Sequence, residues 1–101
     1  MTSENEKVSS MYVVSNIIGC KWSLQVVNAL NKGLVRPGEV KKAIPGISEK
    51  VLNERFKKLV RFGLVERKVF PVSPPRVEYK FTLKGKKFLK ILDSINKFSD
   101  I

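Results

Sequence analysis

Apolar residues recur at intervals of three and four along most of the chain, which is the spacing of one face of an α-helix. This spacing predicts helices over residues 8–18 and 21–33, each with a glycine at its end, and a last helix that begins near residue 84. A short helix is expected to open at Pro37, because a proline in the first turn loses no backbone hydrogen bond. The chain is therefore predicted to be mainly helical.

The stretch "PGIS" separates the short helix from a longer one. Ser48 stands where an N-cap is expected, since its hydroxyl can accept a hydrogen bond from a backbone N–H two or three residues later. Apolar residues then recur at Leu52, Phe56 and Leu59, and charged residues occupy the opposite face. We expect a helix over residues 48–62 with one packed side and one charged side.

Two later stretches, residues 64–70 and 76–82, have the composition of β-strands, with "PVSPP" between them. The second stretch alternates, so Val77, Tyr79 and Phe81 are predicted to face inward. Arg76, Glu78 and Lys80 alternate with these residues and are predicted to face outward. Because proline cannot continue a hydrogen-bond ladder, the loop is expected to project beyond the paired strands.

A short helix, a tight turn and a second helix with a charged outer face are typical of the helix-turn-helix, whose second helix enters the major groove of DNA. A hairpin after that helix makes the module winged. The predicted fold class is therefore mainly α (α+β), a winged helix-turn-helix with a two-stranded β-hairpin.

The charge is concentrated in the same part of the chain. The net charge is +11, and residues 36–90 hold 16 Lys and Arg against 5 Glu, whereas the two ends nearly balance. Such a field attracts a polyanion, either nucleic acid or an anionic membrane surface. The alternative is a solvated basic face that serves solubility.

Several classes of function are disfavoured by what the 101 residues lack. Histidine is absent and Cys20 is the sole cysteine, so the commonest general base and a multi-cysteine zinc site are missing. We expect that the protein is not an enzyme and that it binds no metal ion and no cofactor. No apolar run is long enough to span a membrane, and "MTSENEK" lacks a signal pattern, so a cytoplasmic, nucleoid-associated protein with residues 1–7 disordered is expected.

Three segments carry a resemblance to a known family: "GCKWSLQVVNAL", "RPGEVKKAIPGISEKVLNERFKKLVRFGLVER" and "PPRVEYKFTLKG". In this order and spacing they resemble the HxlR-type winged helix-turn-helix transcriptional regulators, over a domain of residues 8–101. The resemblance implies a dimeric DNA-binding transcription factor whose first and last helices form the dimer interface.

The chain departs from the family pattern in its cysteine positions and in the residue pair before the short helix. Members often carry a cysteine near the start of the first helix, used in some as a redox or electrophile sensor, and here that position is Ser9. Cys20 stands where the family usually has glycine, and we expect it to be a small buried side chain rather than a sensor. The family's Arg-Phe pair before the short helix reads Arg36-Pro37.

Ten residues are candidates for DNA contact: Arg36, Ser48, Glu49, Lys50, Asn53, Glu54, Lys57, Lys68, Arg76 and Lys80. Lysine and arginine suit phosphate or guanine, Asn53 can pair with adenine, and the glutamates can accept from cytosine or act against wrong sequences. The candidates within residues 48–57 also fit a solvated helix face, and Arg36 could instead pair internally. For Arg55, DNA contact and a structural role on the packed flank are both open.

Arg76 follows a loop that three prolines restrict, so its guanidinium can reach a phosphate or a narrow minor groove with little loss of loop entropy. The alternative is an edge-strand charge that prevents aggregation. Lys68 and Lys80 are weaker candidates for the same surface.

One small core cannot hide the apolar faces of both terminal helices, so a homodimer is expected. The predicted interface consists of Met11, Tyr12, Ile18, Phe88, Leu92, Ile95 and Phe98. A plain core is the alternative for this stripe.

The main hypothesis is a homodimeric, sequence-specific transcriptional regulator of double-stranded DNA. Its recognition helix, residues 48–62, lies in the major groove, about 34 Å from that of its partner. The wing, residues 64–82, lies on the backbone or the minor groove. The alternatives are a sequence-blind architectural protein and a protein-interaction module, and the sequence assigns no small-molecule effector.

Overall fold

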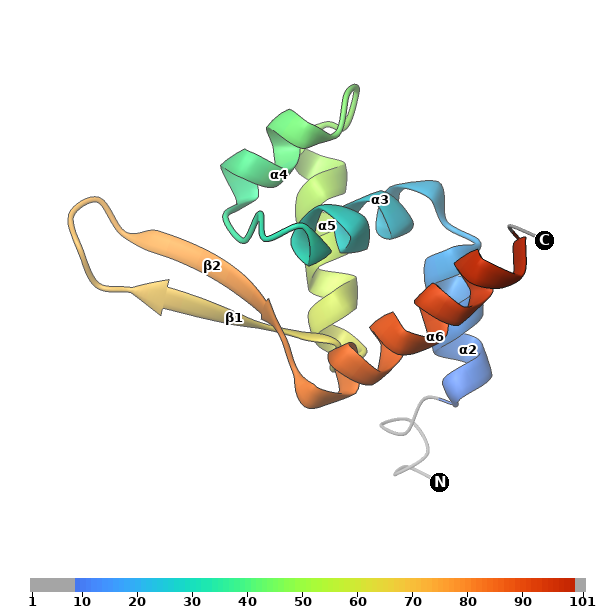
Figure 1. Ribbon diagram of the computed structural model, residues 1–101. Helices are drawn as coiled ribbons and strands as arrows, with labels where there is room; N and C mark the ends of the chain where they lie inside the picture. The colour runs from blue at the N-terminus through green and yellow to red at the C-terminus, as the bar shows by residue number, and fades with distance from the viewer. Residues whose placement is uncertain (1–8, 100–101) are drawn as a thin grey trace.

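The computed structural model describes residues 9–99, which form five helices and one two-stranded sheet (Figure 1). In chain order these are α2 (Ser10–Ile18), α3 (Lys21–Asn31), α4 (Pro37–Ala43), α5 (Glu49–Arg61), β1 (Val65–Phe70), β2 (Arg76–Phe81) and α6 (Leu83–Ser99). The predicted, mainly helical winged fold is confirmed. The predicted disorder of residues 1–7 and the place of Val8 lie outside the described residues.

Serine hydroxyls cap two of the helices. Ser9 Oγ accepts a hydrogen bond from the N–H of Tyr12 at 3.1 Å, and Ser48 Oγ accepts one from the N–H of Val51, also at 3.1 Å. Each cap satisfies a backbone donor that the helix itself leaves without a partner. The Ser48 cap was predicted, and α5 begins one residue after it.

All five helices and the inner face of the hairpin contribute buried residues to the core. Leu52, Phe56 and Leu59 of α5 are buried, as their spacing predicted. The Phe56 ring stacks on Tyr79 of β2, with 4.0 Å between the ring centroids and 4° between the planes. Because aromatic stacking is directional, this pair fixes the hairpin relative to α5.

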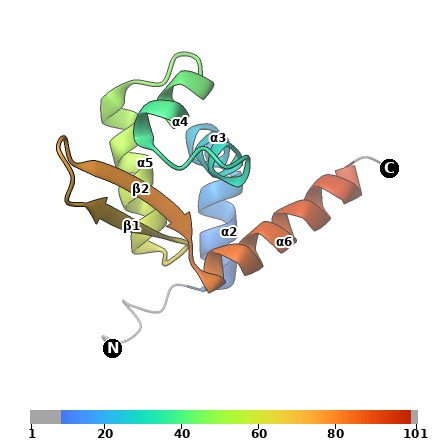
Figure 2. The same ribbon diagram turned by 60° about the vertical axis from the view of Figure 1, so that its left-hand side comes forward.

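The two strands pair antiparallel, with Val65 opposite Phe81 at one end and Phe70 opposite Arg76 at the other. Tyr79 is buried, and its N–H donates to the carbonyl of Val35 at 2.9 Å, which ties β2 to the segment before α4. Val77 and Phe81 pack against the core, so the predicted inward face is confirmed. Figure 2 shows the hairpin as an arm that extends beyond the helices.

Two glycines shape the joint between α5, the hairpin and α6. Gly63 follows α5 with a φ of +77°, a conformation that other residues rarely adopt. Gly85 of α6 lies so close to Leu64 that a Cβ would collide with the Leu64 carbonyl oxygen. The Thr82 hydroxyl donates to the Gly63 carbonyl and accepts from the Gly85 N–H, so α6 begins in close contact with the end of α5.

Helix α6 then runs away from the rest of the molecule (Figures 1 and 2). Phe88 and Leu92 are only 4% and 5% exposed, because they pack into the core of their own chain. This burial corrects their predicted place in a dimer interface, since they leave almost no surface for a second chain. Ile95 and Phe98, further along α6, are exposed.

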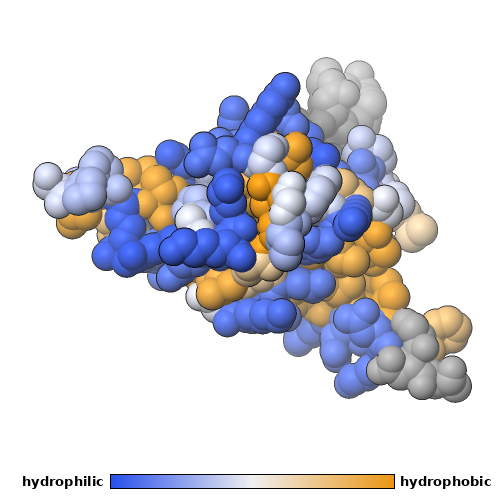
Figure 3. All heavy atoms as spheres, turned by 90° about the horizontal axis from the view of Figure 1, so that it is seen from above, coloured by the Kyte–Doolittle hydropathy of each residue, from blue (hydrophilic) through white to orange (hydrophobic). Residues whose placement is uncertain are grey.

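Helix α2 exposes apolar residues on the side of the molecule where α6 lies. Met11 and Tyr12 are exposed and Ile18 is half-buried, while the edge of the Tyr12 ring meets Phe62 at a centroid distance of 6.0 Å. Hydrophobic surface is visible in the half of Figure 3 opposite the hairpin loop. Across residues 9–99, no helix combines the length and the hydropathy that a membrane crossing needs.

Candidate nucleic-acid interface

The helix-turn-helix consists of α4, the turn that follows it and α5. Val40 of α4 and Ile44 and Ile47 of the turn are buried, so the turn is anchored in the core. Pro37 occupies the first turn of α4, as predicted. This packing directs the apolar face of α5 inward and leaves its polar face on the surface.

The polar face of α5 carries all the residues predicted there for DNA contact. The exposed residues are Ser48, Glu49, Lys50, Asn53, Glu54 and Lys57. Within the described chain, Glu54 alone among them forms an ion pair, with Arg55 at 3.9 Å, and so exposed a pair contributes little to stability. The face therefore offers cations, carboxylates and an amide side by side.

Lys58 fastens the opposite side of α5 to helices α2 and α3. Its Nζ donates to the Asn16 carbonyl at 2.9 Å and to the buried Ser23 hydroxyl at 3.4 Å. Burial lowers the pKa of Lys58, Cys20 opposes that shift and Arg55 adds to it. The orientation of α5 is thus fixed by a polar anchor as well as by its apolar face.

Arg55 lies on the flank of α5 between these two sides. Its side chain is 25% exposed, and its Nε is buried with no hydrogen-bond partner among the described residues. This placement favours the structural role for Arg55 over a contact in a DNA groove.

Arg76 stands at the start of β2, beside the proline loop. Its guanidinium carbon lies 4.6 Å from the centroid of the Phe70 ring, and its Nε lies 3.3 Å from Glu78 Oε2. The Arg76 side chain is 39% exposed, whereas that of Glu78 is 14% exposed, so the predicted outward position holds only partly for Glu78. Arg76 is therefore a restrained arginine rather than a free one.

Arg36 and Arg76 are distant in the sequence but border the same hollow. They line one hollow of about 460 Å³ between the start of α4 and the hairpin loop, together with Pro37, Val72, Ser73, Pro74, Pro75 and Val77. Arg36 is exposed, and its backbone N–H donates to Glu39 Oε1 at 3.4 Å. Two cations beside one hollow suit the negative charge of a phosphate.

Lys68 and Lys80 are exposed on the outer face of the hairpin, which they share with Arg76. Lys68 is paired with Glu78 and Lys80 with Glu66 in the strand register, so each cation has an acid directly opposite. The structure does not bring these two lysines next to α5, because the sheet lies between them.

Arg67 was missed by the sequence analysis. It pairs with Tyr79 in the register and therefore shares the inner face of the hairpin, which turns toward α5. Arg67 lines a hollow of about 500 Å³ with Asn53, Lys57, Val60 and Tyr79. The strand register was the signal, because the residue opposite the inward Tyr79 must also face inward.

Cys20 is the N-cap residue of α3 and is half-exposed. Burial raises the pKa of the Cys20 thiol, but hydrogen bonding to Ser23 and the positive charges of Lys58 and Arg55 lower it to about 7 overall. The expectation of a plain buried side chain is thus corrected. Two of the three groups that lower the pKa lie on α5, far along the chain, where sequence inspection could not associate them with Cys20.

An exposed, charged helix held by a tight turn, with a hairpin beside it, defines the winged helix-turn-helix class of DNA-binding proteins. Among the described residues, no three His, Cys, Asp or Glu side chains are grouped to hold a metal ion. The HxlR-like helix-turn-helix family model matches residues 17–101, and the chain belongs to this family.

Individual relatives agree with that assignment. An uncharacterised helix-turn-helix-type transcriptional regulator from Methanothermobacter thermautotrophicus is 39% identical over 92 residues, which cover 91% of this chain and 70% of that protein. The transcriptional regulator YodB of Bacillus subtilis is 31% identical over 96 residues, covering 95% of this chain and 86% of YodB.

The solved structures that resemble this chain are also transcriptional regulators. The reduced form of YodB matches with a TM-score of 0.80 at 31% identity, over 92% of this chain and 91% of that one. A protein from Enterococcus faecalis V583, assigned to the MarR family of transcriptional regulators, matches with a TM-score of 0.82 at 34% identity, over 90% and 83%. The protein is a DNA-binding transcriptional regulator and not an enzyme, as predicted.

Proposed function

We propose that this regulator binds double-stranded DNA sequence-specifically, with α5 in the major groove and the hairpin over the backbone or the minor groove. The observation that carries the proposal is the orientation of α5: Phe56 and Lys58 fasten its inner side, while its whole polar face stays exposed. A helix roughly 10–12 Å wide fits a major groove that is about 12 Å wide.

The mixture of charges on α5 supports specific rather than sequence-blind binding. Glu49 and Glu54 are exposed beside Lys50 and Lys57, and carboxylates weaken the attraction to phosphate. They are useful where they discriminate between bases, as is the amide of Asn53, which can both donate to and accept from adenine. For a sequence-blind architectural protein, whose affinity comes from attraction to phosphate, such acids on the DNA-facing helix would weaken binding.

In vitro selection from a random duplex pool tests this function. Selected duplexes should bind at least about 10³-fold more tightly than scrambled duplexes at the same salt concentration. The Asn53→Ala variant should lose preference at particular base pairs, whereas Lys86→Ala, at an exposed position of α6, should not. Equal affinity for selected and scrambled duplexes would leave the architectural alternative in place.

We infer that the regulator acts as a homodimer whose interface is formed by α2 and α6. Met11 is 74% exposed and Phe98 is 78% exposed, and both belong to apolar faces that point away from the core. A two-fold axis through these helices would cover both faces and set two α5 helices about 34 Å apart on a near-palindromic site. A monomer with weak DNA binding would instead favour the protein-interaction module.

A further inference from the structure

The inner face of the hairpin carries one charged residue among the paired positions 65–70 and 76–81. The strand register places Arg67 on this face, opposite Tyr79. The other residues on this face are Val65, Val69, Val77 and Phe81. Arg67 is exposed, so its stem can lie along the apolar face while its guanidinium stays within reach of a ligand.

Arg67 shares a hollow of about 500 Å³ with three residues of α5. The three are Asn53, Lys57 and Val60. They are four and three residues apart, so they form one stripe along successive turns of the helix. Tyr79 also lines this hollow, and it is only 8% exposed because its ring stacks on Phe56. The hollow therefore lies between two elements, α5 and the hairpin, whose relative position that aromatic stack fixes.

The two cations of this hollow, Lys57 and Arg67, have no acidic partner in the part of the chain that the structure describes. The cations of the ion pairs formed there are Arg55, Arg76 and Lys97. Two like charges that line one hollow repel each other, and an anion between them replaces that repulsion with two attractions. The hollow between α5 and the hairpin is therefore suited to an anion.

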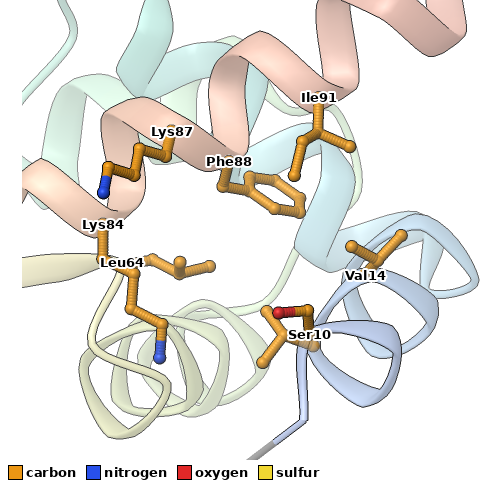
Figure 4. Close-up of a pocket in the computed structure, with 8 residues that line it drawn as sticks. Ser10, Val14, Leu64, Lys84, Lys87, Phe88 and Ile91 are labelled. Carbon is orange, nitrogen blue, oxygen red and sulfur yellow. The ribbon is translucent and has the colours of Figure 1, made fainter.

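The hollow between α2 and α6 does not combine its cations in this way (Figure 4). Figure 4 shows the amino groups of Lys84 and Lys87 directed apart from each other. That hollow also lies between the two helices whose apolar faces we propose a second copy to cover. Of the two hollows, the one beside α5 is the one suited to hold a single anionic group between two cations.

The hollow beside α5 adjoins the proposed DNA surface, because Asn53 and Lys57 belong to the exposed face of α5 as well. A helix roughly 10–12 Å wide nearly fills a major groove about 12 Å wide, so the sugar-phosphate strands that border the groove run along the flanks of the helix. We propose that one DNA strand passes through this hollow and that Arg67 and Lys57 hold one of its phosphates between them. This inference rests on the proposed placement of α5 in the major groove.

In this arrangement Arg67 is a positioning residue, because phosphate contacts fix the register of a protein on DNA and carry no sequence information directly. Lys57 belongs to α5 and Arg67 to β1, so one shared phosphate sets the distance between the recognition helix and the hairpin on the DNA. The hairpin thus meets the backbone with its inner face. Its outer face is less suited, because Lys68 and Lys80 each have an acid directly opposite.

The salt dependence of binding tests whether Arg67 contacts a phosphate. Arg67→Gln should weaken binding roughly tenfold to selected and scrambled duplexes alike, and it should lower the slope of log K against log salt by about one. Lys86→Gln is the matched control, because it removes one positive charge from an exposed position of α6, and it should change neither quantity. Arg67→Lys keeps the charge and should keep the slope. Unaltered affinity and slope in Arg67→Gln would overturn the proposal.

A neutral linkage in the DNA identifies the shared phosphate. A methylphosphonate linkage, which lacks the phosphate charge, is placed at each position of the selected duplex in turn. At one linkage it should cost the unaltered protein roughly tenfold in affinity, and at that same linkage it should cost Arg67→Gln and Lys57→Gln clearly less. A variant that only disturbs the fold would keep its full sensitivity there. Two different linkages for the two variants, or undiminished sensitivity in Arg67→Gln, would refute the shared contact.

Failure of this inference and failure of the proposed function give different results. Equal affinity for selected and scrambled duplexes removes sequence specificity, yet the salt slope of Arg67→Gln still tests the phosphate contact on either duplex. Full specificity together with an unchanged slope in Arg67→Gln leaves the proposed function in place and removes the phosphate contact.

Discussion

Arg76 is restrained before any DNA arrives. The Phe70 ring lies under its guanidinium and Glu78 pairs with its Nε, at 4.6 Å and 3.3 Å. A long side chain that is already ordered loses less rotamer entropy when it binds a ligand. The restraint therefore favours a functional arginine over a solvated edge charge.

The variant Arg76→Ala should weaken binding to all duplexes and lower the slope of log K against log salt by about one, because one phosphate contact is lost. Fluorescence anisotropy at several salt concentrations measures both quantities. Arg76→Lys keeps the charge but loses the planar fork, so it should keep the salt slope if Arg76 holds a phosphate. Unchanged affinity in Arg76→Ala would show that the side chain stays in solvent.

The thiol of Cys20 should be reactive at neutral pH. Its pKa of about 7, against an ordinary value of 9.0, makes the thiolate fraction rise with pH and reach one half near pH 7. The rate of alkylation by iodoacetamide should follow that curve. In Lys58→Met, which removes a nearby positive charge, the midpoint should move to higher pH. A midpoint near 9 in the unaltered protein would contradict the low pKa.

At the scale of elements, close packing fixes α6 against the end of α5. Gly85→Ala adds a Cβ that collides with the Leu64 carbonyl, so the free energy of unfolding should fall by about 1–3 kcal/mol. Gly38→Ala in α4 is the matched control, because nothing lies within 4 Å of the added Cβ. It should leave stability unchanged or raise it by up to about 1 kcal/mol. Urea unfolding measures both, and equal effects would show that α6 does not pack as described.

Local patterns predicted most of the elements, because caps, prolines and apolar spacing act over a few residues. Ser48 and Pro37 each fixed a helix start in this way. The alternation of β1 was obscured, since its inner face holds Arg67 beside the hollow rather than an apolar residue. Contacts such as that of Cys20 with Lys58 depend on how helices pack, which periodicity does not specify.

At the scale of the whole molecule, the apolar stripe of α6 serves two purposes that its spacing cannot separate. Phe88 and Leu92 enter the core, whereas Phe98, near the C-terminal end of the same helix, is 78% exposed. The buried and the exposed apolar residues of α6 repeat at the same helical intervals. They differ only in whether they lie before or after the point at which α6 separates from the other helices. The exposed part is the surface that a second copy can bury.

Disrupting that surface should separate the dimer without unfolding the chain. Phe98→Glu places a charge where we propose an apolar contact, and an unpaired charge is costly to bury, so the dimer dissociation constant should rise at least roughly tenfold. Light scattering after size-exclusion chromatography measures the mass, and the melting temperature of the monomer should stay unchanged because Phe98 contributes little to its own core.

Asn96→Glu is the control for that experiment, because it adds the same charge at an exposed polar position of α6. It should leave the dimer intact. Loss of the dimer should also reduce affinity for a palindromic site toward that for a single half-site, since two linked recognition helices bind with an effective concentration that one helix lacks. If the unaltered chain is already a monomer, or if both variants dissociate equally, the apolar faces of α2 and α6 do not form the interface.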